Sequence, residues 1–308
     1  MENIKDLVII GSGPAGLSAA VYASRAMIDQ VVIEKEMFSG GQIVTTDRID
    51  NYLGLYGENG YDLSVKFRQH ADELKVPFVE GQVTSIEDKG EIKEITLENG
   101  DVINTKAIII ATGAKHKVLG VKGEKELTGA GVSYCATCDG AFFRNKIVAV
   151  VGGGDVALED ALYLANICEK VYLIHRRNEL RGAKILQDKV LKNEKIQFMP
   201  EYQVREIAGN NKVEKITLFN KANETMELEV SGIFIAVGME PQCDFAKEVV
   251  KTDEGGYIVA EEDCRTNVEG IYAVGDIRTK SLRQVVTAVA DGAVAINSLE
   301  VDKNEKIG

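Results

Sequence analysis

The sequence feature that most constrains the fold is a strand, a glycine-rich turn and a helix that occur twice along the chain. The first copy begins with the apolar run 7–10 and continues into Gly11-Ser12-Gly13-Pro14-Ala15-Gly16. The second begins with 147–151 and continues into Gly152-Gly153-Gly154-Asp155-Val156-Ala157. In such a motif the glycines permit a tight turn, close approach of a pyrophosphate to the backbone, and close packing of helix on strand. The two copies therefore predict an α/β fold with two Rossmann-like dinucleotide-binding domains.

The two copies differ in the residue that ends their next strand, 21 residues after Gly13 in the first copy and 21 after Gly154 in the second. In the first copy it is Glu34, whose carboxylate would accept hydrogen bonds from a ribose. The second copy has a basic cluster at and after this position, formed by His175, Arg176, Arg177 and Arg181. Arginines bind a 2′-phosphate bidentately, although such a cluster can also be a solvated surface. The first site therefore suits FAD and the second NADPH.

A pair of cysteines precedes the second copy, in Cys135-Ala136-Thr137-Cys138, and Asp139 follows it directly. Two thiols at this spacing can close a disulfide across one helical turn. At a helix N-terminus the unpaired N–H groups favour a thiolate, which makes one sulfur a nucleophile near neutral pH. The alternatives are half of a zinc site, for which no second cysteine pair follows, and two incidental cysteines. We expect electrons to pass from a nicotinamide through a flavin to this disulfide.

The length, charge and cysteine content limit the classes of protein to which this chain can belong. A chain of 308 residues is long enough for two ordinary domains, each with its own core. Its net charge of −12 disfavours a nucleic-acid partner, which would need a basic face. Cys168, Cys243 and Cys264 stand alone in the sequence and are interpreted as reduced, buried thiols. These features predict a protein of the reducing cytoplasm.

The ends of the chain and its apolar runs bear on localisation. The N-terminal residues lead directly into the first strand, which leaves no room for a secretory leader. The apolar runs are far shorter than a membrane span. We therefore expect a cytoplasmic protein that does not associate with membranes.

The remaining patterns of apolar residues predict the other helices and strands of the chain. Residues 61–74 predict a helix with His70 on its apolar stripe, as a packed residue rather than a ligand. The alternating segments 76–102 and 203–230 predict antiparallel hairpins in corresponding places of the two copies. Further buried strands are predicted at 107–113, 232–238 and 270–276, and a helix at 284–298.

With these motifs in view, the whole chain resembles the low-molecular-weight thioredoxin reductases. The resemblance covers both nucleotide-binding turns, the basic cluster, Cys135-Ala136-Thr137-Cys138-Asp139, and the pairs Gly275-Asp276 and Arg283-Gln284. It implies a homodimer with one FAD per subunit that uses NADPH to reduce the disulfide of thioredoxin. The glutathione reductase branch carries its dithiol in the first nucleotide domain and a catalytic histidine near its C-terminus, and this sequence has neither there.

The resemblance also implies a domain organisation. A discontinuous FAD-binding domain would comprise 1–113 and 241–308, and an NADPH-binding domain, 114–240, would be inserted into it. Each would combine a parallel sheet with a β-meander, and the inserted domain would rotate to present the nicotinamide and the dithiol to the flavin in turn. The implied FAD-binding residues are Gly11, Ser12, Gly13, Pro14, Ala15, Gly16, Glu34, Lys35, Gly41, Gln42, Asn51, Val83, Thr112, Gly113, Gly275, Asp276, Arg283, Gln284 and Val285. The implied NADPH-binding residues are Gly152, Gly153, Gly154, Asp155, His175, Arg176, Arg177, Arg181, Val237 and Gly238.

The resemblance assigns roles within the redox pair. In the family the second cysteine lies against the flavin and the first attacks the substrate, which carries over to Cys138 and Cys135. Asp139 would protonate the departing thiolate of thioredoxin, or would cap the helix beside the cysteines. The sequence departs from the family pattern at Leu53, where proline is frequent, and at Val156, where a small polar residue is common.

Three other functions remain open at this point. One is a flavin-dependent thioredoxin reductase that takes its electrons from reduced ferredoxin, against which the arginine cluster argues. Another is a dithiol flavoenzyme that reduces a different small disulfide carrier protein. The third is a flavin-bound redox sensor without turnover, which the dithiol and Asp139 disfavour.

Overall fold

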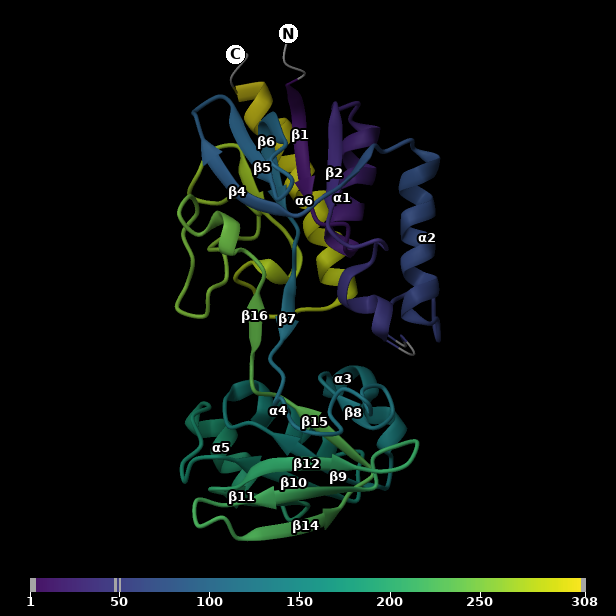
Figure 1. The fold of residues 1–308 in the computed structure, drawn as a ribbon, viewed down its shortest axis with the longest axis vertical. Helices are drawn as coiled ribbons and strands as arrows, with labels where there is room; N and C mark the ends of the chain where they lie inside the picture. The colour runs from purple at the N-terminus through teal and green to yellow at the C-terminus, as the bar shows by residue number, and fades with distance from the viewer. Residues whose placement is uncertain (1–3, 47–48, 50, 306–308) are drawn as a thin grey trace. The chain divides into compact units, whose positions relative to one another are not determined.

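A computed structural model describes residues 4–46, 49 and 51–305 (Figure 1). The chain forms two compact units, one of Met1–Lys115 with Glu240–Gly308 and one of His116–Met239. The chain passes between them through β7 (Ala114–His116) and β16 (Met239–Pro241), which pair as a two-stranded sheet. The predicted α/β class, with parallel sheets and antiparallel strands, is confirmed.

The first unit is built on a seven-stranded sheet of order β3-β2-β1-β6-β5-β4, with β17 paired to β6. Its parallel strands are β1 (Lys5–Ile10), β2 (Gln30–Glu34), β3 (Phe78–Glu80), β6 (Val102–Ile110) and β17 (Ile271–Ala273). The antiparallel strands β4 (Val83–Asp88) and β5 (Lys93–Leu97) continue the sheet from β6. The predicted hairpin at 76–102 is thus a three-stranded meander whose last strand is the long β6.

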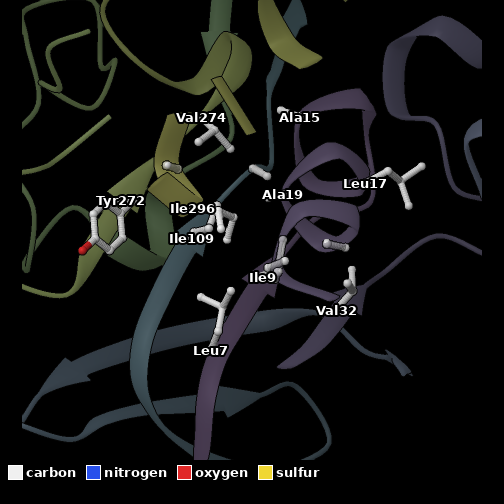
Figure 2. Close-up of a cluster of buried hydrophobic side chains, with 14 of the residues drawn as sticks. Leu7, Ile9, Ala15, Leu17, Ala19, Val32, Ile109, Tyr272, Val274 and Ile296 are labelled. Atoms are coloured by element: carbon white, nitrogen blue, oxygen red, sulfur yellow. The ribbon is translucent and has the colours of Figure 1, made fainter. Parts of the chain in front are cut away.

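Both faces of this sheet are buried. Leu7 and Ile9 of β1 point into a cluster with α1 (Pro14–Arg25) and α6 (Val285–Glu305), as Figure 2 shows. Val8 and Ile10 point into a second cluster on the opposite face. Successive strand residues face opposite sides, so a strand buried on both sides must be apolar throughout. The unbroken apolar runs in the sequence have this cause.

Helix α6 packs unusually close to α1. A Cβ on Gly292 would lie 2.4 Å from the carbonyl oxygen of Ala15, so only glycine fits at this crossing. The Ser18 hydroxyl of α1 donates to the carbonyl oxygen of Val289 over 2.7 Å. These contacts fix α6 against the helix that begins at the first glycine turn. The other helices of this unit are α2 (Gly60–Glu73), η1 (Gly41–Thr45), η3 (Asp244–Ala246) and η4 (Gly275–Ile277).

The second unit repeats this layering with a five-stranded parallel sheet of order β11-β10-β9-β15-β8. Its strands are β8 (Val132–Ser133), β9 (Ile147–Val151), β10 (Lys170–His175), β11 (Ile196–Pro200) and β15 (Gly232–Ile235). The helices are α3 (Ala136–Asp139), η2 (Gly140–Phe143), α4 (Asp155–Ala165) and α5 (Lys184–Leu191). The antiparallel sheet consists of β12 (Gln203–Ala208), β13 (Lys215–Phe219) and β14 (Thr225–Glu229).

The second sheet is also buried on both faces. Val148 and Val150 of β9 pack with α4, while Ala149 and Val151 pack with the antiparallel strands. The segment 203–230 therefore covers one face of the second sheet as a three-stranded meander rather than a single hairpin.

Three expectations from the sequence need correction. His70 is exposed on α2 and does not join its buried face, because the helix turns Leu63, Ser64 and Ala71 toward the unit. Helix α6 continues to Glu305, past the predicted end, and Asp302 in this extension accepts a hydrogen bond from Tyr272. The predicted strands at 107–113 and 232–238 end early, at Ile110 and Ile235, and 270–276 forms only the short β17 before η4.

Among the described residues, no helix combines the length and the apolar character that a membrane crossing requires.

Candidate functional site

The first glycine turn lies between the ends of β1 and β6. A Cβ on Gly11 would lie 2.7 Å from the carbonyl oxygen of Ala111, and one on Gly16 would lie 1.9 Å from the carbonyl oxygen of Gly11. A Cβ on Gly13, by contrast, would meet nothing within 4 Å. The turn is thus closely packed against the protein at its ends and open at its centre. The open centre, at the N-terminus of α1, can admit a phosphate group.

Two distant glycines reach this turn. A Cβ on Gly41 would lie 3.6 Å from the Cα of Gly13, and one on Gly275 would lie 2.9 Å from the Cβ of Ala15. The structure therefore brings three segments of the predicted FAD site together, although they are far apart in the sequence.

Glu34 is bound to the turn itself. Its Oε2 accepts hydrogen bonds from the N–H of Ser12 over 2.7 Å and from the Ser12 hydroxyl over 2.6 Å. Its Oε1 accepts from the N–H of Glu36 over 3.0 Å. The carbonyl oxygen of Ser12 in turn accepts from the N–H of Gly40. The carboxylate that the sequence places at the end of β2 is therefore held at the edge of the open turn.

Asp276 carries a buried oxygen, Oδ1, that has no hydrogen-bond partner among the described residues. Burial raises the pKa of this carboxyl group, against the attraction of Lys280 and Arg283. The Nε of Arg283 is also buried without a partner in the described part of the chain, and its guanidinium lies 4.0 Å from the ring centre of Tyr257. Buried polar atoms normally have partners, so a ligand with a hydroxyl group fits beside Asp276.

The other residues of the predicted FAD-binding set differ in their hydrogen bonds and in their exposure. Asn51 donates from Nδ2 to the Oε1 of Gln284 over 2.8 Å, which joins the loop before α2 to the start of α6. Thr112 donates to the carbonyl oxygen of Gln242, and Val83 is buried on β4 in the core. The side chains of Lys35 and Gln42 are exposed, Val285 is half-buried at the start of α6, and Gly113 has open space where a Cβ would lie.

The second glycine turn has the same construction. A Cβ on Gly152 would lie 2.4 Å from the carbonyl oxygen of Ala236, and Gly154, like Gly13, has nothing within 4 Å. Where the first turn has its third glycine, Gly16, the second has Ala157, which is fully buried in the core beneath α4. The helix N-terminus of α4 thus faces an open space of the same kind.

His175 lies under the middle glycine of this turn. It is only 5% exposed, and a Cβ on Gly153 would lie 2.5 Å from the imidazole ring. Burial lowers the pKa of His175, and the nearby arginines lower it further. Its Nε2 is buried without a partner among the described residues. The imidazole is therefore a neutral packing group under the turn.

The arginines of the cluster are exposed, and the backbone near the last of them is tied to the turn. The N–H groups of Arg181 and Gly182 both donate to the carbonyl oxygen of Gly153, over 2.6 and 3.1 Å. Asp155 accepts from the N–H of Ala183 over 2.6 Å. These bonds place the Arg181 backbone beside the open turn, where its side chain could reach a phosphate.

Val237 and Gly238 follow β15 directly. Val237 is 37% exposed, and Gly238 has a φ of +115°, a conformation that favours glycine. The carbonyl oxygen of Gly238 accepts from the N–H of Lys117 over 3.0 Å.

Cys135 and Cys138 form a disulfide, as the spacing predicts. Cys135 is the N-cap residue of α3, and its Sγ accepts a hydrogen bond from the N–H of Cys138 over 3.2 Å. Among the described residues, no group of three or more His, Cys, Asp or Glu side chains is arranged to hold a metal ion.

Asp139 is held by a residue that sequence reasoning missed. The Ser133 hydroxyl donates to the Oδ2 of Asp139 over 2.6 Å, and the N–H of Cys135 donates to the same hydroxyl over 3.1 Å. Ser133 is buried at the end of β8. Its place two residues before the cysteine pair was the only available signal.

The three remaining cysteines are free and buried, as predicted. Burial raises the pKa of Cys168 to about 11 and that of Cys264 to about 12. Burial also raises the pKa of Cys243. A thiol of raised pKa is a poor nucleophile near neutral pH, so these residues do not compete with the disulfide pair.

Two open glycine turns of opposite charge environment and one redox disulfide define a nucleotide-dependent oxidoreductase of the α/β class. The chain belongs to the pyridine nucleotide-disulphide oxidoreductase family, whose model matches residues 5–292. Members of this family use FAD and NADPH when they are thioredoxin reductases, so these are the cofactors of the chain.

Individual relatives agree with this assignment. The chain is 46% identical to a thioredoxin reductase of Peptoclostridium acidaminophilum, over 97% of each chain. The crystal structure of thioredoxin reductase from Streptococcus pyogenes MGAS5005 matches with a TM-score of 0.93 at 42% identity, over 99% of this chain and 100% of that one. The FR conformation of Lactococcus lactis thioredoxin reductase matches with a TM-score of 0.67 at 44% identity, over 98% and 99%. The resemblance to the thioredoxin reductases is thereby confirmed.

Proposed function

We propose that this chain is a thioredoxin-disulfide reductase that passes electrons from NADPH through FAD and the Cys135/Cys138 dithiol to thioredoxin. The observation that carries the proposal is the Cys135–Cys138 disulfide at the start of α3, in a chain with two nucleotide turns. FAD, when bound, supplies the chemistry that accepts a hydride from NADPH and gives two electrons to a disulfide.

The first unit provides groups that fit FAD. The open centre of its turn, at Gly13, and the N-terminus of α1 would bind the pyrophosphate. Glu34 at the edge of the turn would accept from a ribose hydroxyl, and the unpartnered oxygen of Asp276 from another hydroxyl of the cofactor. The full set of FAD-binding residues named above is part of this proposal.

The second unit provides groups that fit NADPH. Arg176, Arg177 and Arg181 are exposed beside the turn, where their guanidinium groups would bind the 2′-phosphate. His175 supports the turn from below and remains neutral. The NADPH-binding residues named above, with Asp155, Val237 and Gly238, complete this proposal.

The dithiol performs two exchange steps. The Cys135 thiolate, stabilised by the N–H of Cys138, attacks one sulfur of the thioredoxin disulfide and releases the other as a thiolate. Asp139, oriented by Ser133, gives a proton to that departing thiolate. The first attack leaves a mixed disulfide between Cys135 and thioredoxin. The Cys138 thiolate then attacks the Cys135 sulfur and breaks its bond to the thioredoxin sulfur, which restores the Cys135–Cys138 disulfide and releases the second thioredoxin sulfur as a thiolate.

The test is single replacement of each cysteine in the full-length flavoprotein. Cys135→Ser and Cys138→Ser should each abolish thioredoxin reduction while NADPH-driven flavin reduction continues. Cys168→Ala, which alters a buried thiol outside the disulfide, is the matched control and should retain both activities. Retention of more than about 5% of the disulfide reductase activity in either single variant would show that the pair is not the relay.

The electron donor and the acceptor are tested together. Turnover with thioredoxin should proceed with NADPH and be far slower with NADH. Turnover with reduced ferredoxin alone would instead support the ferredoxin-dependent alternative. Turnover with another small disulfide carrier, but not with thioredoxin, would change the assigned partner.

We also propose a cytoplasmic homodimer without nucleic-acid or membrane partners. The net charge of −12 supports the absence of a nucleic-acid partner, and three free buried thiols support a reducing compartment. Sedimentation of the flavoprotein should give a mass near twice that of the 33.5 kDa chain. A monomer at micromolar concentration would contradict this assembly.

The rotation of the inserted domain stays a proposal as well. The dithiol and the proposed NADPH site both belong to His116–Met239, whereas the proposed FAD site belongs to the other unit. Either each reaches the flavin in turn, by rotation about the connections near Gly113 and Pro241, or NADPH reaches the other face of the flavin; we favour rotation because it also exposes Cys135 to the partner. A cross-link between engineered cysteines that holds the dithiol at the flavin should stop NADPH-driven flavin reduction until it is cut. Undiminished turnover in the linked enzyme would contradict rotation.

A further inference from the structure

A buried cluster of charged side chains lies next to the Gly275-Asp276 pair. Its centre is Asp291, on the second turn of α6, which is only 6% exposed. Arg278 and Lys280 follow Asp276 in the chain, and both direct their charged ends to Asp291. The side chains of both cations are less than 10% exposed.

The Asp291 carboxylate accepts four hydrogen bonds. Its Oδ1 accepts from the Nη2 of Arg278 over 2.8 Å, and its Oδ2 accepts from the Nε of Arg278 over 2.9 Å. The same Oδ2 accepts from the Nζ of Lys280 over 2.8 Å and from the backbone N–H of Gly275 over 2.8 Å. Burial disfavours the charged form, but the bonds from Arg278 and Lys280 outweigh burial and lower the pKa of Asp291.

The residues that donate to Asp291 lie on both sides of Asp276 in the sequence. Gly275 comes directly before Asp276 and has a φ of +73°, a conformation that glycine adopts readily, and its N–H donates to the Oδ2 of Asp291. Arg278 and Lys280 come two and four residues after it. One carboxylate on α6 therefore anchors the segment on both sides of Asp276, while the Oδ1 of Asp276 has no partner in the part of the chain that the structure describes.

The cluster also acts on the charge of Asp276. Asp291 pairs with two cations, Arg278 and Lys280, and Lys280 also attracts the charged form of Asp276. A simple structural ion pair would need one cation, and it would not need the backbone N–H before a site residue. The second cation and this N–H point to a function at Asp276.

We propose that Asp291 is a positioning residue of the flavin site, which holds the Gly275-Asp276 segment so that the Asp276 carboxylate is aimed at a hydroxyl group of FAD. The inference rests on the proposed placement of FAD in the first unit. Asp291 acts through Asp276 and need not contact the cofactor.

The experiment measures the affinity of the full-length apoprotein for FAD, by the change in flavin fluorescence on binding, in a double-mutant cycle. The variants are Asp291→Asn, Asp276→Asn and the two combined. Asp302→Asn is the matched control, because Asp302 also lies on α6 and also accepts bonds from an arginine, Arg265. The midpoint potential and visible spectrum of the bound flavin are recorded for each variant.

We expect Asp291→Asn to weaken FAD binding about tenfold or more, because charge-assisted bonds are lost, and Asp302→Asn to change it less than about twofold. The double variant should bind little worse than either single variant, since residues that act through one another are not additive. The flavin spectrum or potential should shift in Asp291→Asn but not in the control. Lys280→Met, which removes one donor only, should give a smaller loss and serves if Asp291→Asn does not fold.

Equal losses in Asp291→Asn and Asp302→Asn, or additive losses in the double variant, would overturn the positioning role while leaving the proposed function intact. Failure of the wild-type apoprotein to bind FAD would overturn both.

Discussion

The two glycine turns share one backbone construction and differ in the contact at their middle residue. In the first, Ser12 donates twice to Glu34, which lies at the end of the following strand. In the second, Gly153 leaves room for the imidazole of His175 at the corresponding position. The first turn therefore keeps an acid at its edge, and the second keeps a neutral ring beneath it and arginines beyond. The two turns thus differ in the side chains at a single point, which fits the two nucleotides proposed for them.

The last residue of the six-residue motif, Gly16 in the first copy and Ala157 in the second, differs as well. Gly16 cannot carry a side chain, because a Cβ there would lie 1.9 Å from the carbonyl oxygen of Gly11. The second turn accepts Ala157 at the same position, and Gly152 has a φ of +156° where Gly11 has +102°. The different φ at the first glycine accompanies the extra methyl group of Ala157 in the second turn.

The strongest test of this difference is to exchange glycine and alanine at Gly16 and Ala157. Gly16→Ala should abolish FAD binding, because the methyl group cannot fit without opening the turn. Ala157→Gly should cost only about 1 kcal/mol of stability and leave the KM for NADPH nearly unchanged. Flavin content after purification and urea unfolding measure the two outcomes. Full flavin occupancy in Gly16→Ala would disprove the close packing assigned to this turn.

The arginines beyond the second turn provide the next test. Replacement of Arg176 and Arg181 together by alanine should lower kcat/KM for NADPH by at least about a hundredfold, since two charge-assisted bonds are each worth about 1.5–3 kcal/mol. The value for NADH, which lacks the 2′-phosphate, should hardly change. Arg205→Ala is the control, because Arg205 lies in the same unit and bonds Asn223. Equal losses for NADH and NADPH would argue against phosphate recognition.

The middle position allows the chemistry of one turn to be transplanted into the other. Gly153→Ser alone should destabilise the protein by about 1–3 kcal/mol, because its Cβ would lie 2.5 Å from the His175 ring. Adding His175→Glu should recover part of this loss, since the new carboxylate can accept from the serine as Glu34 does from Ser12. Unfolding free energies of both single variants and the double variant provide the coupling. A double variant no better than Gly153→Ser would show that the turns are not equivalent here.

The smallest expected effect concerns pH. Burial and then the arginines lower the pKa of His175 below its ordinary value of 6.5. The unfolded chain therefore takes up a proton at His175 before the folded chain does, and stability falls as the pH drops below about 6.5. His175→Gln should reduce this slope in Tm measured from pH 7.5 to 5.5. His70→Gln, which alters an exposed imidazole, should leave the slope of the wild type.

Features with a local cause were predictable from the sequence. Both glycine turns, the acid at Glu34 and the arginines at the matching position depend on strands and helices that are neighbours in the chain. The disulfide likewise needs only the spacing of Cys135 and Cys138, which one turn of helix brings together. Short-range geometry fixes such features because few alternative conformations are open to adjacent residues.

Only the tertiary structure decided how distant side chains meet. His175 belongs to the predicted cluster, yet it is buried beneath Gly153 whereas the arginines are exposed. His70 matches the periodicity of an apolar stripe and is exposed. Asp291 gave no signal in the sequence, because its partners lie on a loop more than ten residues earlier and α6 must first pack on α1. Such contacts depend on the packing of whole elements, and residue spacing alone does not determine it.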